Sequence, residues 1–391
     1  MELYIHIPFC VRKCDYCDFL SAPADGQTQA AYMEALEREL CLAAEEHEGE
    51  TIETVFIGGG TPSVVDSDLL CRLLSKMQER FTLEEGAEIS MEANPGTLTA
   101  KKLAAYRQAG VNRLSIGLQS MDGRDLKTAG RIHTAEEFLR NFDLAREAGF
   151  ANINVDLMSA LPGQTVSSWE RTLRRTADLK PEHISAYSLI IEEGTPFWDR
   201  YESHPELLPS EEEDRRMYHL TKKVLAEAGY ERYEISNYAR PGFACRHNMG
   251  YWKRTPYLGL GLGASSFYAG QRFRNTGSLS RYLELMSARE LSSSPQRTAW
   301  REEFVTLTRQ DAMEEFMFLG LRLTAGIRKE DFWQSFGQEI VTVYGSVLER
   351  LTAEGLLERT KAGWRLSEWG LDVSNRVLAR FLLQGGEGAI G

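Results

Sequence analysis

The sequence predicts an α/β protein with a parallel sheet, followed by a smaller, winged-helix-like C-terminal domain. Short apolar runs alternate with amphipathic segments over residues 3–189, several of these runs end in glycine or polar residues, and helical patterns return after residue 301. The alternation is typical of βα units. With 391 residues and 42% hydrophobic content, the chain is long enough to bury two cores.

Six short apolar runs have the composition of buried strands. They lie at residues 3–7, 54–57, 88–92, 113–118, 152–157 and 183–189. Amphipathic segments lie between them, near residues 27–46, 66–79, 99–108, 135–148 and 168–178. Because strands and helices alternate, we expect a parallel βα array whose ligand-binding residues lie at the carboxyl ends of the strands.

The pattern changes after residue 210. A helix is expected over 211–228, because acidic residues begin it and Gly229 suits its end. Residues 230–275 are dense in Tyr, Gly and Arg, and 257–263 are predicted to form loop and strand rather than helix. We expect a first domain over 1–286, a linker over 287–301 and a second domain over 302–391. In the second domain, a helix over 348–358 is expected to lead into a β-wing at 363–366.

The charge and hydropathy patterns exclude two classes of protein. Forty-five basic against 57 acidic residues give a net charge of −12, and no long basic stretch occurs, so nucleic acid is not an expected partner. The N-terminal residues lack a basic region followed by an apolar one, and no run of about eighteen apolar residues occurs. We therefore expect a cytoplasmic protein with no integral membrane segment.

Three of the six cysteines, Cys10, Cys14 and Cys17, fall within eight positions directly after the first predicted strand. In a reducing compartment such grouping indicates a metal site rather than disulfides. Thiolates suit an iron–sulfur cluster or zinc, and three ligands on a four-iron cluster leave one iron open to another ligand. A closed zinc site with His6 as the fourth ligand, or three unligated thiols, also fits this spacing.

The CxxxCxxC spacing resembles the signature of the radical S-adenosylmethionine (SAM) superfamily, which implies a partial (β/α)6 barrel. Further segments resemble the oxygen-independent coproporphyrinogen III oxidase family: YIHIPFC at 4–10, FIGGGTPS at 56–63, SIGLQS at 115–120 and NVDLMSALPGQT at 154–165. The resemblance implies a 4Fe-4S cluster whose open iron is chelated by SAM. In that family an electron from the reduced cluster cleaves SAM to a 5′-deoxyadenosyl radical.

The same resemblance implies a set of SAM-binding residues. Glycines after a strand let a ligand approach the main chain, carboxylates can accept from a ribose diol or an ammonium group, and arginine can clamp a carboxylate. The implied residues are Tyr4, Tyr16, Gly59, Gly60, Thr61, Glu92, Gln119, Arg131 and Asp156. Taken singly, the charged residues also fit strand-end salt bridges, and the tyrosines also fit a core role.

Two features separate the chain from the oxidase branch. That branch carries a long segment before its cluster motif and a further cysteine two positions after the third one, where this chain has Phe19. The segment HNMGYW at 247–252 resembles the HNxxYW motif of HemW-type heme chaperones. A histidine is a good axial ligand of heme, a thiolate is another, and aromatic rings offer flat apolar faces. The heme candidates are His247, Asn248, Tyr251, Trp252 and Cys245.

The HemW-type resemblance implies a protein that binds heme and delivers it to heme-accepting proteins rather than oxidising a porphyrinogen. Membrane-bound respiratory enzymes are the expected acceptors, reached through transient membrane contact, and the cluster requires an electron donor. Two alternatives stay open at this point: oxidative decarboxylation of coproporphyrinogen III, and a radical SAM reaction on another substrate. The sequence also leaves open whether SAM is cleaved or only bound.

Overall fold

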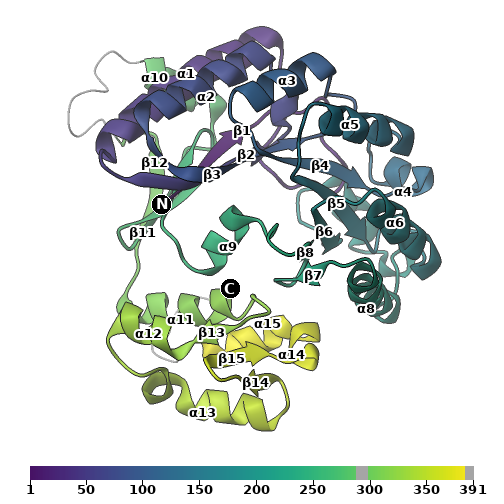
Figure 1. Ribbon diagram of the computed structural model, residues 1–391, viewed down its shortest axis with the longest axis vertical. Coiled ribbons are helices and arrows are strands. Elements are labelled where there is room, and N and C mark those ends of the chain that lie inside the picture. The colour runs from purple at the N-terminus through teal and green to yellow at the C-terminus, as the bar shows by residue number, and fades with distance from the viewer. Residues whose placement is uncertain (288–297, 384–391) are drawn as a thin grey trace. The chain divides into compact units, whose positions relative to one another are not determined.

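The structure is a computed structural model that describes residues 1–287 and 298–383 (Figure 1). The chain divides into two compact units. The first contains the described parts of residues 1–231, 236–247 and 256–305, and the second those of residues 232–235, 248–255 and 306–391. Most of the predicted linker, residues 288–297, lies outside the described residues.

The first unit is built on one large sheet whose central strands are parallel. Those strands are β1 (Glu2–Ile7), β2 (Thr51–Gly59), β3 (Thr82–Ala93), β4 (Arg113–Gln119), β5 (Ile153–Ser159) and β6 (His183–Ser188). Each pairs in parallel with the next, so their carboxyl ends lie at one edge. Beyond β6 the antiparallel strand β8 (Asn237–Ala239) follows, with β7 (Glu231–Arg232) next to it, and the sheet does not close. The predicted partial barrel is confirmed.

Helices follow the central strands and cover the sheet (Figure 1). The longer ones are α1 (Gly26–Glu46), α2 (Ser67–Arg80), α3 (Ala100–Gln108), α5 (Ala135–Glu147), α6 (Val166–Asp178) and α8 (Glu211–Glu227). Each begins after an Asp, Thr or Ser whose side chain accepts a hydrogen bond from a first-turn N–H. The short helices α4 (Gly123–Thr128) and α7 (Pro196–Tyr201) were not predicted, because six residues are too few to show a helical period.

Four further strands extend the sheet on the other side of β1: β9 (Tyr257–Leu260), β10 (Ser265–Tyr268), β11 (Gln271–Asn275) and β12 (Arg301–Thr306). Strand β9 confirms the strand predicted within 257–263, and it pairs in parallel with β1. Gly259 is required in β9, since a Cβ there would lie 2.2 Å from the Ser265 carbonyl oxygen. Helix α10 (Leu279–Ser287) also belongs to the first unit, whereas helix α9 (Arg246–Trp252), which was not predicted, has its first two residues in the first unit and the rest in the second.

A buried carboxylate joins α1 to these outer strands. Glu39 is 1% exposed, and its oxygens accept hydrogen bonds from the Gly261 N–H at 2.8 Å, Asn275 Nδ2 at 2.6 Å, the Tyr282 hydroxyl at 2.5 Å and Trp300 Nε1 at 3.1 Å. A buried carboxylate is costly unless hydrogen bonds compensate it, and four donors do so here. Burial still raises the pKa of Glu39 above its ordinary value.

The second unit has its own core and a small antiparallel sheet. Its helices are α11 (Arg309–Gly320), α12 (Lys329–Phe336), α13 (Ile340–Ala353), α14 (Glu368–Asp372) and α15 (Ser374–Leu378), and its strands are β13 (Ile327–Arg328), β14 (Leu357–Arg359) and β15 (Gly363–Leu366). Helix α13 leads into the β14–β15 hairpin, which confirms the predicted helix and wing. Within the described residues, no helix combines the length and the apolar character needed to span a membrane.

Replacing Glu39 by Ala is expected to lower the free energy of unfolding by about 3 kcal/mol or more, because four buried donors lose their acceptor. Thermal and urea unfolding of both proteins measure the loss. Glu34→Ala is the matched control, since Glu34 is exposed on the same helix. Equal loss in the two variants would contradict the assigned role of Glu39.

Candidate cofactor-binding site

A cavity of about 370 Å³ lies at the carboxyl ends of the parallel strands of the first unit. It gathers all three clustered cysteines and all but one of the residues predicted to bind SAM. The predicted residues that line it are Cys10, Cys14, Cys17, Tyr16, Gly59, Gly60, Thr61, Glu92, Gln119, Arg131 and Asp156. Tyr4 does not line this cavity, and its hydroxyl lies 3.0 Å from His6 Nδ1.

The loop that carries the three cysteines, residues 10–17 (the cysteine loop), is held by hydrogen bonds to other parts of the protein. The Cys10 N–H donates to the Ala22 carbonyl at 3.3 Å, and the Cys17 N–H donates to the Cys14 carbonyl at 3.2 Å. Asp15, between the cysteines, is buried and accepts a hydrogen bond from Arg200 Nη1 at 2.7 Å. Burial raises the pKa of the Cys10 and Cys17 thiols, and a bound metal would act in the opposite direction, because thiolate is the form that ligates metals.

The environment of His6 bears on the zinc alternative. Its Nδ1 lies 3.0 Å from the Tyr4 hydroxyl and its Nε2 lies 2.9 Å from the Leu20 carbonyl oxygen, so both ring nitrogens have partners. In the part of the chain that the structure describes, no three His, Cys, Asp or Glu side chains are grouped to hold a single ion. In a four-iron cluster each thiolate binds a different iron, so its ligands need not converge on one point. The geometry favours a cluster over a closed Cys3His site.

The glycine turn after β2 packs directly against the cysteine loop. A Cβ at Gly60 would lie 2.5 Å from the Phe9 carbonyl oxygen, and one at Gly59, whose φ is +105°, would lie 2.3 Å from the His6 ring. The Gly60 N–H donates to the Ile7 carbonyl at 2.9 Å, and the Thr61 N–H donates to the Phe9 carbonyl at 2.6 Å. Only glycine allows the two segments to approach this closely. Because neither residue has a Cβ, a ligand can also approach the backbone beside the cysteines.

Two carboxylates face the cavity, Glu92 from β3 and Asp156 from β5. Glu92 accepts a hydrogen bond from the Gly59 N–H at 3.0 Å, and Asp156 accepts one from the Ser115 hydroxyl at 2.8 Å. Burial, followed by repulsion from Asp156, raises the pKa of Glu92 to about 7. Burial also raises the pKa of Asp156. Paired acceptors of this kind can bind an ammonium group or the hydroxyls of a ribose.

Gln119, at the end of β4, lines the cavity in a strained conformation. Its φ is +71°, in the left-handed region that side chains other than glycine rarely occupy. Strain of this kind costs of the order of 1 kcal/mol and tends to persist at functional sites, where the surrounding structure imposes it. The position of Gln119 therefore agrees with its predicted role at the site.

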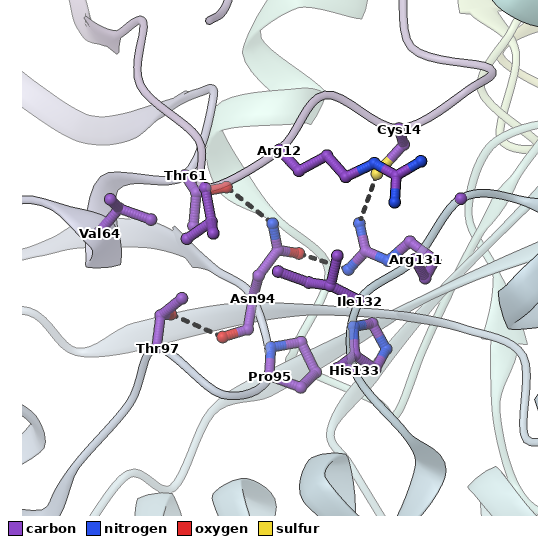
Figure 2. A pocket seen from close by; sticks show the side chains of 12 residues that line it. Arg12, Cys14, Thr61, Val64, Asn94, Pro95, Thr97, Arg131, Ile132 and His133 are labelled. Atoms are coloured by element: carbon purple, nitrogen blue, oxygen red, sulfur yellow. Dashed lines mark hydrogen bonds between the residues drawn. The ribbon is translucent and has the colours of Figure 1, made fainter. Parts of the chain in front are cut away.

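Arg131 connects the cysteine loop to the strand ends (Figure 2). Its Nη1 donates to Cys14 Sγ at 3.3 Å, and its Nη2 donates to Asn94 Oδ1 and to the Gly117 carbonyl, both at 2.6 Å. Asn94 Nδ2 in turn donates to the Thr61 hydroxyl at 2.7 Å. Sequence reasoning did not single out Asn94, and the available signal was its place in the polar stretch that ends β3.

The heme candidates His247 and Cys245 lie outside this cavity and contact side chains of β2 and β3. His247 is 1% exposed, its Nδ1 lies 2.8 Å from the Thr54 hydroxyl, and its ring stacks on Phe56 with 5.2 Å between centroids. Burial, and then the charge of Arg113, lower the pKa of His247 to about 3, so the ring is neutral. Neither residue lines the cavity.

Other contacts show how the HNxxYW segment is anchored. Cys245 is fully buried, with Sγ 3.4 Å from Glu88 Oε1, and the Arg246 N–H donates to the other Glu88 oxygen at 3.2 Å. Three remaining candidates belong to the second unit and are half-buried: Asn248, Tyr251 and Trp252. The Arg322 guanidinium lies 4.4 Å from the Trp252 ring centroid, a cation–π contact within that unit.

The raised pKa of Glu92 predicts a pH-dependent stability difference between the wild type and Glu92→Gln. Between its unfolded pKa near 4.5 and its folded pKa of about 7, Glu92 holds its proton better in the folded state, so wild-type stability falls as pH rises. The variant lacks this loss and should gain up to about 3 kcal/mol relative to wild type from pH 4.5 to pH 8. Urea unfolding at both pH values measures the gap, and a pH-independent gap would contradict the assignment.

Comparison with protein families matches both parts of the chain. The Radical SAM superfamily model matches residues 4–176, and the HemN C-terminal domain model matches residues 307–373. Heme chaperone HemW of Lactococcus lactis is 37% identical over 97% of each chain. Heme chaperone HemW of Escherichia coli is 36% identical over 98% of each chain. A mitochondrial radical S-adenosyl methionine domain-containing protein 1 of mouse is 33% identical over 98% of this chain and 87% of its own.

Solved structures extend the likeness to the fold. Coproporphyrinogen III oxidase (HemN) from Escherichia coli, described as a radical SAM enzyme, superposes with a TM-score of 0.83 over 97% of this chain and 89% of its own, at 25% identity. Membership of the radical SAM superfamily implies a 4Fe-4S cluster and SAM, and the cavity residues fit both groups. This chain belongs to the radical SAM superfamily and, within it, to the HemW family.

Proposed function

We propose that the protein is a heme chaperone that binds a 4Fe-4S cluster, SAM and heme and passes heme to acceptor proteins. The observation that carries this proposal is the similarity over 97% or more of the chain to relatives named heme chaperone HemW. The cavity supports the cofactor part of the proposal, because three thiols and a set of polar groups suited to SAM line one space.

In this proposal Cys10, Cys14 and Cys17 hold the cluster and leave one iron for SAM. Gly60 and Thr61 receive the amino-acid end of SAM beside the cysteine loop, while Glu92 and Asp156 accept hydrogen bonds from its polar groups. When bound together, the cluster and SAM supply one-electron chemistry. The protein positions the two groups and limits access of water to them.

The mouth of the cavity supports the binding of an apolar ligand or partner. Phe19, which replaces the further cysteine of the oxidase branch, is 59% exposed and lines the cavity together with Tyr187 and Ile190, which are 40% and 68% exposed. Exposed apolar side chains grouped at a cavity mouth are typical of a surface that binds an apolar ligand or a partner. A porphyrin presents the flat apolar face that such side chains suit.

The acceptors and the electron source belong to the same proposal. We expect a donor protein to reduce the cluster, and heme-dependent respiratory enzymes at the membrane to accept heme from a cytoplasmic chaperone that associates with the membrane transiently. Transfer to a purified apo-acceptor, followed by the absorption spectrum of the acceptor, tests delivery. A heme-loaded chain that never loses heme to any apo-acceptor would contradict it.

An anaerobic heme titration of the reconstituted protein separates the chaperone from the oxidase. A chaperone is expected to give a saturable Soret band and to form no protoporphyrinogen from coproporphyrinogen III with SAM and reductant. Product formation in that assay would establish the oxidase alternative. SAM cleavage without turnover of either porphyrin would indicate a reaction on another substrate.

Replacing Cys10, Cys14 or Cys17 by Ala should abolish the cluster, because a cubane left with two protein ligands is poorly retained. Iron content and the visible absorption of the reconstituted protein measure the loss. Cys41→Ala and Cys71→Ala are matched controls, since both thiols lie outside the cavity. Loss of iron in the controls as well would contradict this ligand assignment.

His247→Ala is expected to destabilise the first unit by roughly 2 to 4 kcal/mol while leaving the Soret band intact, because the ring is buried between Thr54 and Phe56. Thermal unfolding and the heme titration are measured on the same preparation. His204→Ala serves as the control, since that imidazole is exposed. A folded His247→Ala protein that has lost the Soret band would instead assign heme ligation to His247, after local opening around α9.

A further inference from the structure

We propose that Arg131 raises the reduction potential of the cluster by placing a positive charge and a hydrogen bond against the Cys14 sulfur, and that Asn94 is the positioning residue that aims it. This inference rests on the proposed binding of a 4Fe-4S cluster by Cys10, Cys14 and Cys17. It assigns to both residues a role that is distinct from holding SAM.

Arg131 directs one guanidinium nitrogen at the sulfur of Cys14. Its Nη1 lies 3.3 Å from Cys14 Sγ, and its Nη2 donates to Asn94 Oδ1 at 2.6 Å (Figure 2). Nη2 also donates to the Gly117 carbonyl at 2.6 Å. The guanidinium is planar, so fixing one nitrogen fixes the direction of the other. A Cβ at Gly117 would lie 3.3 Å from Nη2 and 2.7 Å from Asn94 Oδ1, so glycine makes room for this arrangement.

The Arg131 side chain is partly enclosed, so water screens its charge less than that of a fully exposed side chain. Its Nε is enclosed and has no hydrogen-bond partner, so the group is held at some cost within the protein. Arg12 and Lys13 carry the same charge on the cysteine loop, but both are exposed, and water screens them. The carboxylates Glu92 and Asp156 face the same cavity and act in the opposite direction.

Asn94 connects this charge to the predicted SAM site. Its Oδ1 accepts from Arg131 and its Nδ2 donates to the Thr61 hydroxyl at 2.7 Å, and Thr61 in turn donates through its N–H to the Phe9 carbonyl beside Cys10. The two ends of the amide are thereby fixed, and Asn94 cannot turn without breaking one of these bonds. Together with the Gly117 carbonyl, its orientation therefore directs the guanidinium.

The effect on the potential follows from charge balance. Reduction transfers one electron from the donor protein to the cluster, which gains one negative charge while the donor is oxidised by one electron. A nearby positive charge stabilises the reduced form more than the oxidised form, and hydrogen bonds to cluster sulfurs raise the potential in the same direction. Removing Arg131 should therefore make the cluster harder to reduce.

The test is an anaerobic redox titration of the reconstituted full chain without SAM, in which electron paramagnetic resonance follows the reduced cluster. Arg131→Gln should lower the reduced-to-oxidised ratio at a fixed potential about tenfold, which is about 59 mV for a one-electron couple. Arg131→Lys should show a smaller shift because it keeps the charge, and Asn94→Ala should shift the potential in the same direction as Arg131→Gln.

Arg12→Gln is the matched control, because it removes the same charge from the cysteine loop at a side chain that is 61% exposed. A shift in Arg131→Gln no larger than that in Arg12→Gln would overturn the inference. If Arg131→Gln binds no cluster, unchanged potentials in Arg131→Lys and Asn94→Ala overturn it equally. Failure of the wild type to bind a cluster would overturn the proposed function as well, whereas an intact wild-type cluster with unshifted variants overturns this inference alone.

Discussion

Parallel pairing of β1 with β2 is the constraint on which the site depends. The register that places His6 opposite Gly58 and Ile7 opposite Gly59 brings the cysteine loop and the glycine turn to the same edge of the sheet. Hydrogen bonds from Gly60 and Thr61 then join the two loops across a distance that no Cβ could occupy. The strand ends that follow, from β3 to β5, add their polar residues to this pair in chain order.

Much of this arrangement could be predicted from the sequence, because the central strands and longer helices carry strong apolar periods and clear N-caps. The edge of the sheet that carries the cavity was predictable because parallel strands direct their carboxyl ends to one edge, whereas the individual SAM-binding residues were implied by the family resemblance. Asn94 was not predictable, because a single amide in a polar turn has no period and its role comes from three-dimensional contacts with Arg131 and Thr61. The short helices α4, α7 and α9 were missed because their lengths are close to one or two turns.

The HNxxYW segment shows what residue types alone leave open. Its residue types suit heme, yet the structure places His247 and Cys245 among buried polar partners on β2 and β3, where the histidine is neutral and 1% exposed. A motif indicates which residues matter to a family, but it does not separate ligands from anchors. That separation depends on burial and partner atoms, which only the folded chain supplies.

Contacts within the protein support the cysteine loop. Asp15 is tied to Arg200, Cys10 to Ala22, and the glycine turn to Phe9, and none of these bonds involves a metal. Protein contacts thus contribute to the shape of the loop, unlike in small zinc domains, whose fold depends on the ion. Because these bonds run through the backbone and through Asp15, substituting a single cysteine leaves them available, so loss of iron in such a variant reports on ligation rather than on unfolding.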